Sequence, residues 1–173
     1  LRQDNPWTDS WENFFAHALR RFFEIDQSVN GPSSEIANLC YGIFQSVIPR
    51  LLGPLENQVQ KLKPCLIHGD LWPGNLAVNT ATKRVIIFDA CSFWGYNEYD
   101  LAEWGPSQLK FSHYILEQYH MYIPRSSPKD EYDDIIRLYF LRFNLHDSAP
   151  FPSLPVYRKR FIYAFRRLKP VPR

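Results

Sequence analysis

Two stretches in the N-terminal third of the chain carry apolar residues at helical spacing. In residues 9–25 the apolar positions recur every three or four residues and share one helix face: Trp11, Phe14, Phe15, Ala18, Phe22 and Ile25. In residues 34–52 a second stripe is formed by Ile36, Leu39, Ile43, Phe44, Val47 and Leu51. Thr8 or Asp9 is a suitable N-cap for the first stretch. The pattern predicts two amphipathic helices whose apolar faces belong to a core.

The pattern changes between residues 65 and 89. Short apolar runs at Cys65–Ile67, Leu76–Val78 and residues 85–88 have the length and composition of strands. Residues 79–84 are polar and separate the second run from the third, as a hairpin loop does. We therefore predict a small β-hairpin inserted between helices.

Helical spacing returns over residues 100–169. The apolar positions fall into three groups, which are Phe111, Ile115, Tyr119 and Tyr122, then Tyr132, Ile135, Ile136, Tyr139, Phe140 and Phe143, and finally Tyr157, Phe161, Phe165 and Leu168. Pro124 ends the first group. The order of elements predicts one α+β domain over residues 1–173, mostly helical with a small β-hairpin.

Composition narrows the class of protein. The 173 residues are 45% apolar, which excludes a disordered chain, and the net charge of +2 gives no strong attraction to nucleic acid or to a membrane surface. The basic residues of the last helix fit a solvated face better than a nucleic-acid site. Three cysteines without metal-ligand spacing, and no apolar run of membrane-spanning length, predict a soluble protein of a reducing compartment, the cytoplasm.

The chemistry-bearing residues lie in the hairpin region. Asp70 follows the first strand, Asn75 opens the second, and Asp89 closes the third. Because a hairpin returns its end to the level of its start, Asp89 should lie beside Asn75, with Asp70 close by. We therefore expect three oxygen-bearing side chains at one mouth of the hairpin.

This set suits phosphoryl transfer from ATP. Asp70 fits the base that orients the attacking hydroxyl, and Asn75 and Asp89 offer the oxygen ligands that Mg²⁺ prefers. Kinases use the same order: a catalytic Asp, an Asn five residues on, and a metal-binding Asp after a hairpin. We interpret His68 as a structural support of the loop.

Each of these residues alone has an ordinary alternative. A loop Asp is usually a turn or cap residue, and Asn75 after Gly74 fits a tight turn. The joint pattern favours a kinase. A kinase-like binding protein without catalysis is a second hypothesis, and a metal-dependent hydrolase built on His68, Asp70 and Asp89 is a third.

Two motifs resemble a known family. Residues 68–75 read H-G-D-L-W-P-G-N, and residues 87–102 read I-F-D-A-C-S-F-W-G-Y-N-E-Y-D-L-A. Both resemble the fructosamine 3-kinase (ketosamine 3-kinase) family, which belongs to the aminoglycoside phosphotransferase and choline kinase-like group. Residues 6–7, 14–15 and 143–146 also resemble it, and the set is similar to a divergent fungal branch.

The resemblance implies a protein-kinase-like fold, here its C-terminal lobe, and a kinase that uses ATP and Mg²⁺. Its acceptor would be the 3-hydroxyl of a ketoamine (fructosamine or ribulosamine) on a glycated protein lysine. By matching position, Asp70 would be the base, and Asn75 and Asp89 would hold the metal and with it the nucleotide.

The resemblance gives further residues roles around this centre. Trp72 would wall the substrate pocket, and Asp100 would brace the catalytic loop. Asn144 and His146 would be pocket residues, although helix packing explains them as well.

The sequence departs from the family pattern at Ala90, Cys91 and Tyr96. None of these changes removes a catalytic atom, but they leave the acceptor open. An aminoglycoside, choline or similar hydroxyl remains an alternative acceptor, against which Leu71-Trp72 argues.

The family also has an N-terminal ATP-binding lobe, for which this chain shows no segment. We expect the full-length protein to carry that lobe, and the 173-residue chain alone to bind nucleotide weakly and turn over slowly or not at all.

Overall fold

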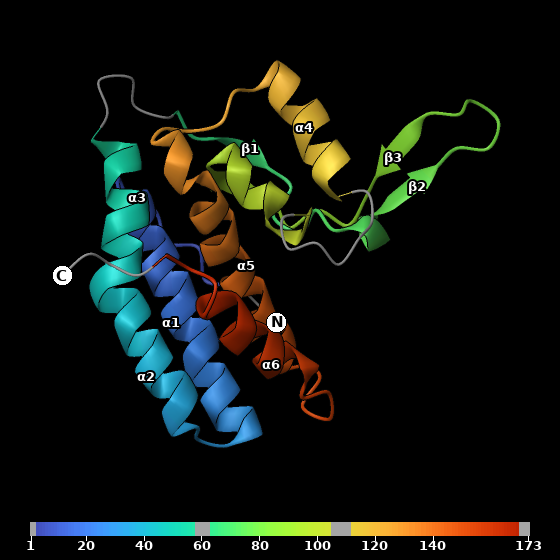
Figure 1. The fold of residues 1–173 in the computed structure, drawn as a ribbon. Coiled ribbons are helices and arrows are strands. Elements are labelled where there is room, and N and C mark those ends of the chain that lie inside the picture. The colour runs from blue at the N-terminus through green and yellow to red at the C-terminus, as the bar shows by residue number, and fades with distance from the viewer. Residues whose placement is uncertain (1–2, 58–62, 105–111, 170–173) are drawn as a thin grey trace.

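The computed structural model of the chain describes residues 3–57, 63–104 and 112–169. It is a helical body with two small antiparallel sheets, as expected for the α+β class (Figure 1). Phe111, which we predicted to open a helix, lies outside the described residues.

The first predicted helix is α1, which spans Trp11–Asn30. Its N-cap is Ser10 rather than Thr8 or Asp9, because the Ser10 hydroxyl accepts the Asn13 N–H at 3.1 Å. The helix continues beyond residue 25 and ends at Gly31, whose φ of 78° breaks the helical geometry.

The second predicted helix, residues 34–52, is longer and interrupted. It comprises α2 (Ser34–Gly42), a π-helical turn η1 (Ile43–Val47) and α3 (Ile48–Glu56). The Ile48 N–H donates to the carbonyl of Ile43, five residues back. The next residue, Pro49, has no N–H for the backbone hydrogen bonds of the helix. The π-helical turn therefore lies where the helix loses a donor.

The strands confirm the predicted hairpin and add one that the sequence did not reveal. Strand β2 (Leu76–Val78) pairs antiparallel with β3 (Val85–Ile87), and Leu76 faces Ile87. Strand β1 (Cys65–Ile67) pairs with β4 (Phe93–Gly95), which we had not predicted. Because β4 is three residues long, it carries no readable alternation.

The C-terminal half is helical, as predicted. It contains the 3₁₀ helix η3 (Asn97–Trp104), then α4 (Ser112–Tyr122), the 3₁₀ turn η4 (Lys129–Glu131), α5 (Tyr132–Ser148) and α6 (Val156–Phe165). Among the helices of the described segments, none is long and apolar enough to span a membrane.

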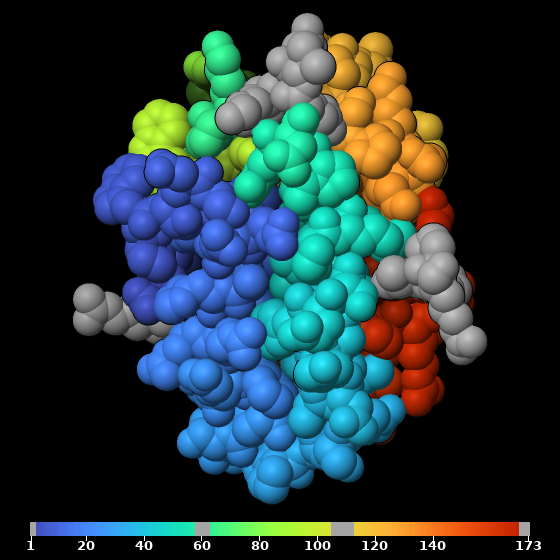
Figure 2. All heavy atoms as spheres, turned by 90° about the vertical axis from the view of Figure 1, so that its left-hand side faces the viewer, coloured from blue at the N-terminus to red at the C-terminus, as the bar shows by residue number. Residues whose placement is uncertain are grey.

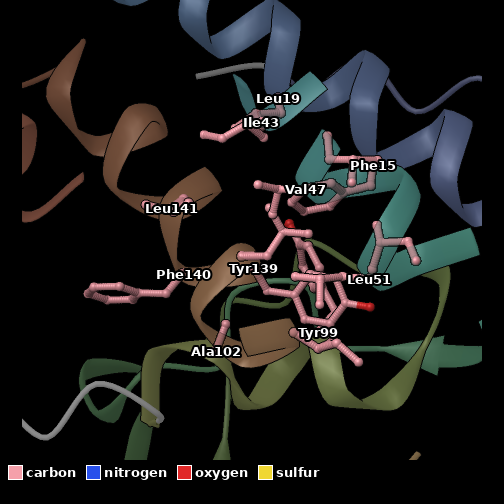
Figure 3. Close-up of a cluster of buried hydrophobic side chains, with 14 of the residues drawn as sticks. Phe15, Leu19, Ile43, Val47, Leu51, Tyr99, Ala102, Tyr139, Phe140 and Leu141 are labelled. Carbon is pink, nitrogen blue, oxygen red and sulfur yellow. The ribbon is translucent and has the colours of Figure 1, made fainter. Parts of the chain in front are cut away.

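Helix α5 is the centre of the body, because α1, α3, α6 and η3 all pack against it. The close-up in Figure 3 shows the core between them, where Tyr99 of η3 meets Tyr139 of α5 with ring centroids 5.6 Å apart. Helices α1 and α2–α3 lie side by side and form one face of the molecule (Figure 2). The predicted apolar stripes thus face inward.

A buried ion pair joins the first helix, α1, to the last helix, α6. Asp26 of α1 is fully buried, and its carboxylate accepts bonds from the guanidinium of Arg158 of α6, the shortest at 2.8 Å. The Ser148 hydroxyl of α5 donates at 2.6 Å, and the side-chain amides of Gln27 and Asn30 in α1 donate as well. The carboxylate is therefore tolerated in the core because donors from three helices surround it.

We predict that Arg158→Met destabilises the protein by about 3–5 kcal/mol, because the Asp26 carboxylate then stays buried without its cation. Urea unfolding measures this loss. Arg166→Met is the matched control, since its pair with Glu35 is exposed at the surface and contributes about 0–1 kcal/mol. Equal losses in the two variants would show that the buried pair is not a structural anchor.

Candidate active site

The loop after β1 is held by one carboxylate. Asp100 of η3 accepts the N–H of His68 at 2.7 Å and the N–H of Gly69 at 2.8 Å, one on each oxygen. Burial raises the pKa of Asp100, and the two N–H groups act in the opposite direction. This geometry fits the bracing role predicted for Asp100.

Gly69 lies where no other residue fits. Its φ is 82°, and a Cβ at this position would lie 2.4 Å from the carbonyl oxygen of Cys91. In addition, the Cys91 N–H donates to the His68 carbonyl at 2.9 Å. The loop before Asp70 and the segment after Asp89 are therefore in direct backbone contact.

His68 connects the same two segments through its ring. Nδ1 lies 3.3 Å from the N–H of Asp70, and Nε2 lies 3.0 Å from the carbonyl oxygen of Phe88. With these partners Nδ1 accepts and Nε2 donates, which places a ring proton on Nε2. A His68 committed in this way matches the predicted structural support.

Asn75 and Asp70 are joined directly. The buried Asn75 amide donates from Nδ2 to the Asp70 carboxylate at 3.0 Å and to the Asp70 carbonyl at 2.9 Å. No hydrogen bond among the described residues uses Asn75 Oδ1, so that oxygen remains available to a ligand. The bonded side fixes where the free oxygen points.

Asp89 comes to this site through the hairpin. The Phe88 N–H donates to the Asn75 carbonyl at 3.2 Å, so the end of the third segment lies beside the start of the second. Asp89 is exposed and has a φ of 56°, a left-handed conformation that Asp tolerates better than most residues. The left-handed residue ends the strand pairing and turns the chain toward Cys91.

Trp72 covers the loop between Asp70 and Asn75. A Cβ on Gly74 would lie 2.1 Å from Cη2 of the Trp72 ring, so the indole rests on the glycine. Trp72 is 46% exposed, which leaves much of its ring open to solvent. Its neighbour Leu71 accepts the indole N–H of Trp104 at 2.7 Å. Both tryptophans thus fix the loop, and the exposed ring fits a pocket wall.

Asn144 and His146 lie on α5. The Asn144 side chain is buried and donates to the Phe140 carbonyl one turn earlier, which is a packing role. His146 contacts Asp147 at 2.9 Å and stacks edge-on against Phe22. In the described chain, no hydrogen bond joins either residue to Asp70, Asn75 or Asp89, so their pocket role remains a prediction.

Glu103 is a residue that we did not predict. It is partly exposed, but its Oε1 is buried without a hydrogen-bond partner. Burial raises its pKa to about 7, and the charges of Asp147 and Asp70 act in the same direction. No motif marks Glu103, because an acidic residue in a short helix usually lies in solvent.

The oxygen atoms present fit a magnesium ion that is shared with a nucleotide. No cluster of three His, Cys, Asp or Glu side chains in the described residues can hold a metal alone. Mg²⁺ bound to phosphates needs only one or two protein ligands, and the free Asn75 Oδ1 and the exposed Asp89 carboxylate supply that number.

We predict that Gly69→Ala destabilises the protein more than Gly31→Ala. Both glycines have positive φ, so each substitution costs about 1–3 kcal/mol of backbone strain. Only Gly69 adds a collision with a carbonyl, whereas a Cβ on Gly31 meets nothing within 4 Å. Urea unfolding of the two variants measures the difference, and equal losses would show that the Cys91 segment does not confine the loop.

Comparison with known families gives a match over most of the chain. The model of the fructosamine kinase family matches residues 1–155. Mouse ketosamine-3-kinase is 35% identical over 126 residues, which cover 73% of this chain and 38% of the mouse protein. The chloroplastic protein-ribulosamine 3-kinase of Oryza sativa subsp. indica is 32% identical over 151 residues, 85% of this chain and 41% of the rice protein.

Solved structures share the fold. A Thermobifida fusca protein named as a candidate fructosamine-3-kinase superposes with a TM-score of 0.71 at 23% identity, covering 96% of this chain and 53% of its own. A Haemophilus somnus protein named in the same way gives 0.70 at 19% identity, covering 96% and 52%. The chain therefore spans about half of these structures and about two fifths of the curated relatives.

Proposed function

The chain belongs to the fructosamine kinase family, and from this membership we propose that it is the catalytic lobe of an ATP-dependent ketosamine kinase. The reaction transfers the γ-phosphate of ATP to a sugar hydroxyl of a ketoamine, a fructosamine or ribulosamine adduct on a protein lysine. The names of the mouse and rice relatives support both the reaction and the class of acceptor.

One observation carries the proposal: the 3.0 Å bond from the Asn75 amide to the Asp70 carboxylate. It turns the Asn75 nitrogen toward the base and leaves Oδ1 for a metal. An Asn that only forms a turn beside a capping Asp does not need its nitrogen bonded to that Asp and its oxygen left without a partner. The Phe88–Asn75 backbone bond, next to Asp89, supports the proposal that the three oxygen-bearing groups form one site.

Asp70 is the proposed base. Its carboxylate orients the attacking hydroxyl and accepts its proton as the oxygen bonds to phosphorus. Asn75 holds one carboxylate oxygen of Asp70, and the His68 ring accepts the Asp70 N–H. The base therefore meets its substrate in a fixed position, which is a large part of what an enzyme supplies in phosphoryl transfer.

Asn75 and Asp89 are the proposed ligands of Mg²⁺, and through it of the ATP phosphates. The ion, when bound, neutralises charge that develops on the phosphates during transfer. The exposed Asp89 carboxylate lies at the mouth of the hairpin, where nucleotide can reach it from solvent.

We also propose that residues 1–173 form one lobe, and that the full-length protein has an N-terminal lobe over the hairpin. Figure 1 shows β2 and β3 projecting from the helical body. Large apolar side chains on and beside them are exposed, namely Val78, Val85, Ile86, Ile87 and Phe88. A second lobe over this surface would explain their exposure, and the greater length of the relatives leaves room for it.

The test of the function is phosphate transfer by the full-length protein. We expect label from the γ-phosphate of ATP to appear on a fructosyl-lysine or ribulosyl-lysine peptide, in a reaction that requires Mg²⁺. Transfer to choline or an aminoglycoside with none to a ketoamine would refute the proposed acceptor. Binding of ketoamine without any transfer would favour a kinase-like binding protein.

We predict that Asp70→Asn lowers kcat for this transfer by about 10²–10⁴-fold, because the amide cannot accept the hydroxyl proton. The variant keeps the shape of the loop, so its binding of MgATP should change little. Asp133→Asn is the control, since Asp133 is exposed in the first turn of α5 and is not one of the proposed site residues. If Asp70→Asn retains the wild-type rate, Asp70 is not the base.

A further inference from the structure

Glu103 lies between the catalytic loop and helix α5. The next residue, Trp104, donates its indole N–H to the carbonyl of Leu71, the residue after Asp70. From the other side, Asp147 near the end of α5 exerts the strongest charge effect on Glu103, and Asp70 the next. Glu103 therefore stands beside the proposed base but makes none of the bonds that shape the loop.

Within the part of the chain that the structure describes, the Glu103 carboxyl makes no ion pair. Its Oε1 is buried without a hydrogen-bond partner. A buried carboxylate oxygen without a donor is costly, and native structures rarely keep one without a reason. Glu103 Oε1 therefore lacks a hydrogen-bond donor among the described residues.

The charges around Glu103 favour a cation. The charges of Asp147 and Asp70 raise the pKa of Glu103, and Arg160 and Arg142 act against them with a smaller effect. Arg142 is only 2% exposed, and its guanidinium packs against the rings of Phe22, Tyr99 and Phe143, with Nε unpaired. Because burial and these two carboxylates raise the pKa of Glu103 to about 7, a cationic ligand would favour its ionised form.

Simpler ligands do not fit this place. A phosphate group would meet three carboxylates and be repelled. A bare metal ion would need a cluster of ligands that the described residues do not form. An organic ammonium supplies both missing features at once, a positive charge and N–H donors.

We propose that Glu103, with Asp147 beside it, binds the protonated amine of the acceptor and so makes the enzyme select cationic ketoamines. The proposal deepens the proposed function and rests on it. A ketoamine is a secondary amine, which is protonated at neutral pH, and its nitrogen lies a few bonds from the hydroxyl that is phosphorylated. A Glu103 next to the base is placed to hold the nitrogen while Asp70 orients the hydroxyl.

His146 gains a role from this arrangement. Its Nδ1 lies 2.9 Å from an Asp147 oxygen and so restrains the Asp147 carboxylate. His146, which the sequence motif marked as a pocket residue, would then act by positioning Asp147. Asp147 is 37% exposed on its side chain, so a ligand can reach it.

The experiment compares two acceptors and two forms of residue 103 in the full-length protein. The first acceptor is a fructosyl-lysine peptide. The second is its analogue with an ether oxygen in place of the amine, which keeps the sugar but carries no charge. Rates give KM and kcat for the amine, and competition against it gives the inhibition constant of the ether.

We expect Glu103→Gln to raise KM for the amine by about tenfold or more, the effect of losing a charged hydrogen bond. The kcat should stay within about twofold, as should the inhibition constant of the ether. Asp147→Asn should act in the same direction and more weakly. Glu24→Gln is the control, because Glu24 is exposed on α1, where it pairs with Arg21, and it should change nothing.

The outcomes separate the inference from the proposed function. If Glu103→Gln weakens both acceptors equally, or lowers kcat alone, Glu103 is a structural or positioning residue and the inference fails while the function stands. If the wild-type protein phosphorylates no ketoamine, the function fails and takes the inference with it. Unchanged ether binding by the variant also shows that the substituted site is still folded.

Discussion

The geometry of the site depends on one carboxylate that accepts two backbone N–H groups. Asp100 binds the amides of His68 and Gly69 and so ties η3 to the end of β1. From this bond the loop gains its left-handed Gly69, its contact with Cys91 and the direction of its next residue, Asp70. The His68 ring then links the loop to the end of the hairpin at Phe88. The His68 contact with Phe88 thus depends on the loop position that the Asp100 bonds fix.

The same frame explains which oxygen atoms are free. Buried polar groups normally have hydrogen-bond partners, so the atoms without a partner stand out. The nitrogen of Asn75 is used on Asp70, which leaves the oxygen for a metal. The carboxyl of Glu103 has no internal partner, and Arg142 is confined by aromatic rings.

The sequence was sufficient to predict the parts that depend on local pattern. Apolar spacing gave the helices, because a long amphipathic stripe is readable without tertiary information. The polar residues 79–84 indicated the hairpin loop. From the hairpin we predicted that Asp89 returns to the level of Asn75.

Other features depend on contacts between distant segments and could not be predicted. Strand β4 is defined only by its pairing with β1, and three residues carry no periodicity of their own. The π-helical turn follows from Pro49 within a longer helix, although its form could not be deduced from the proline alone. Glu103 becomes distinctive only because η3 and α5 bury it beside Asp70 and Asp147. The roles of Trp72 and Asn144 remain predictions for the same reason, since they depend on a substrate.

The most direct test is a crystal structure of the full-length protein with Mg²⁺, a non-hydrolysable ATP analogue and a ketoamine peptide. We expect the ion to bind Asn75 Oδ1 and the Asp89 carboxylate, and a sugar hydroxyl to lie within hydrogen-bond distance of Asp70. A metal held by other residues, or a sugar hydroxyl placed away from Asp70, would contradict it.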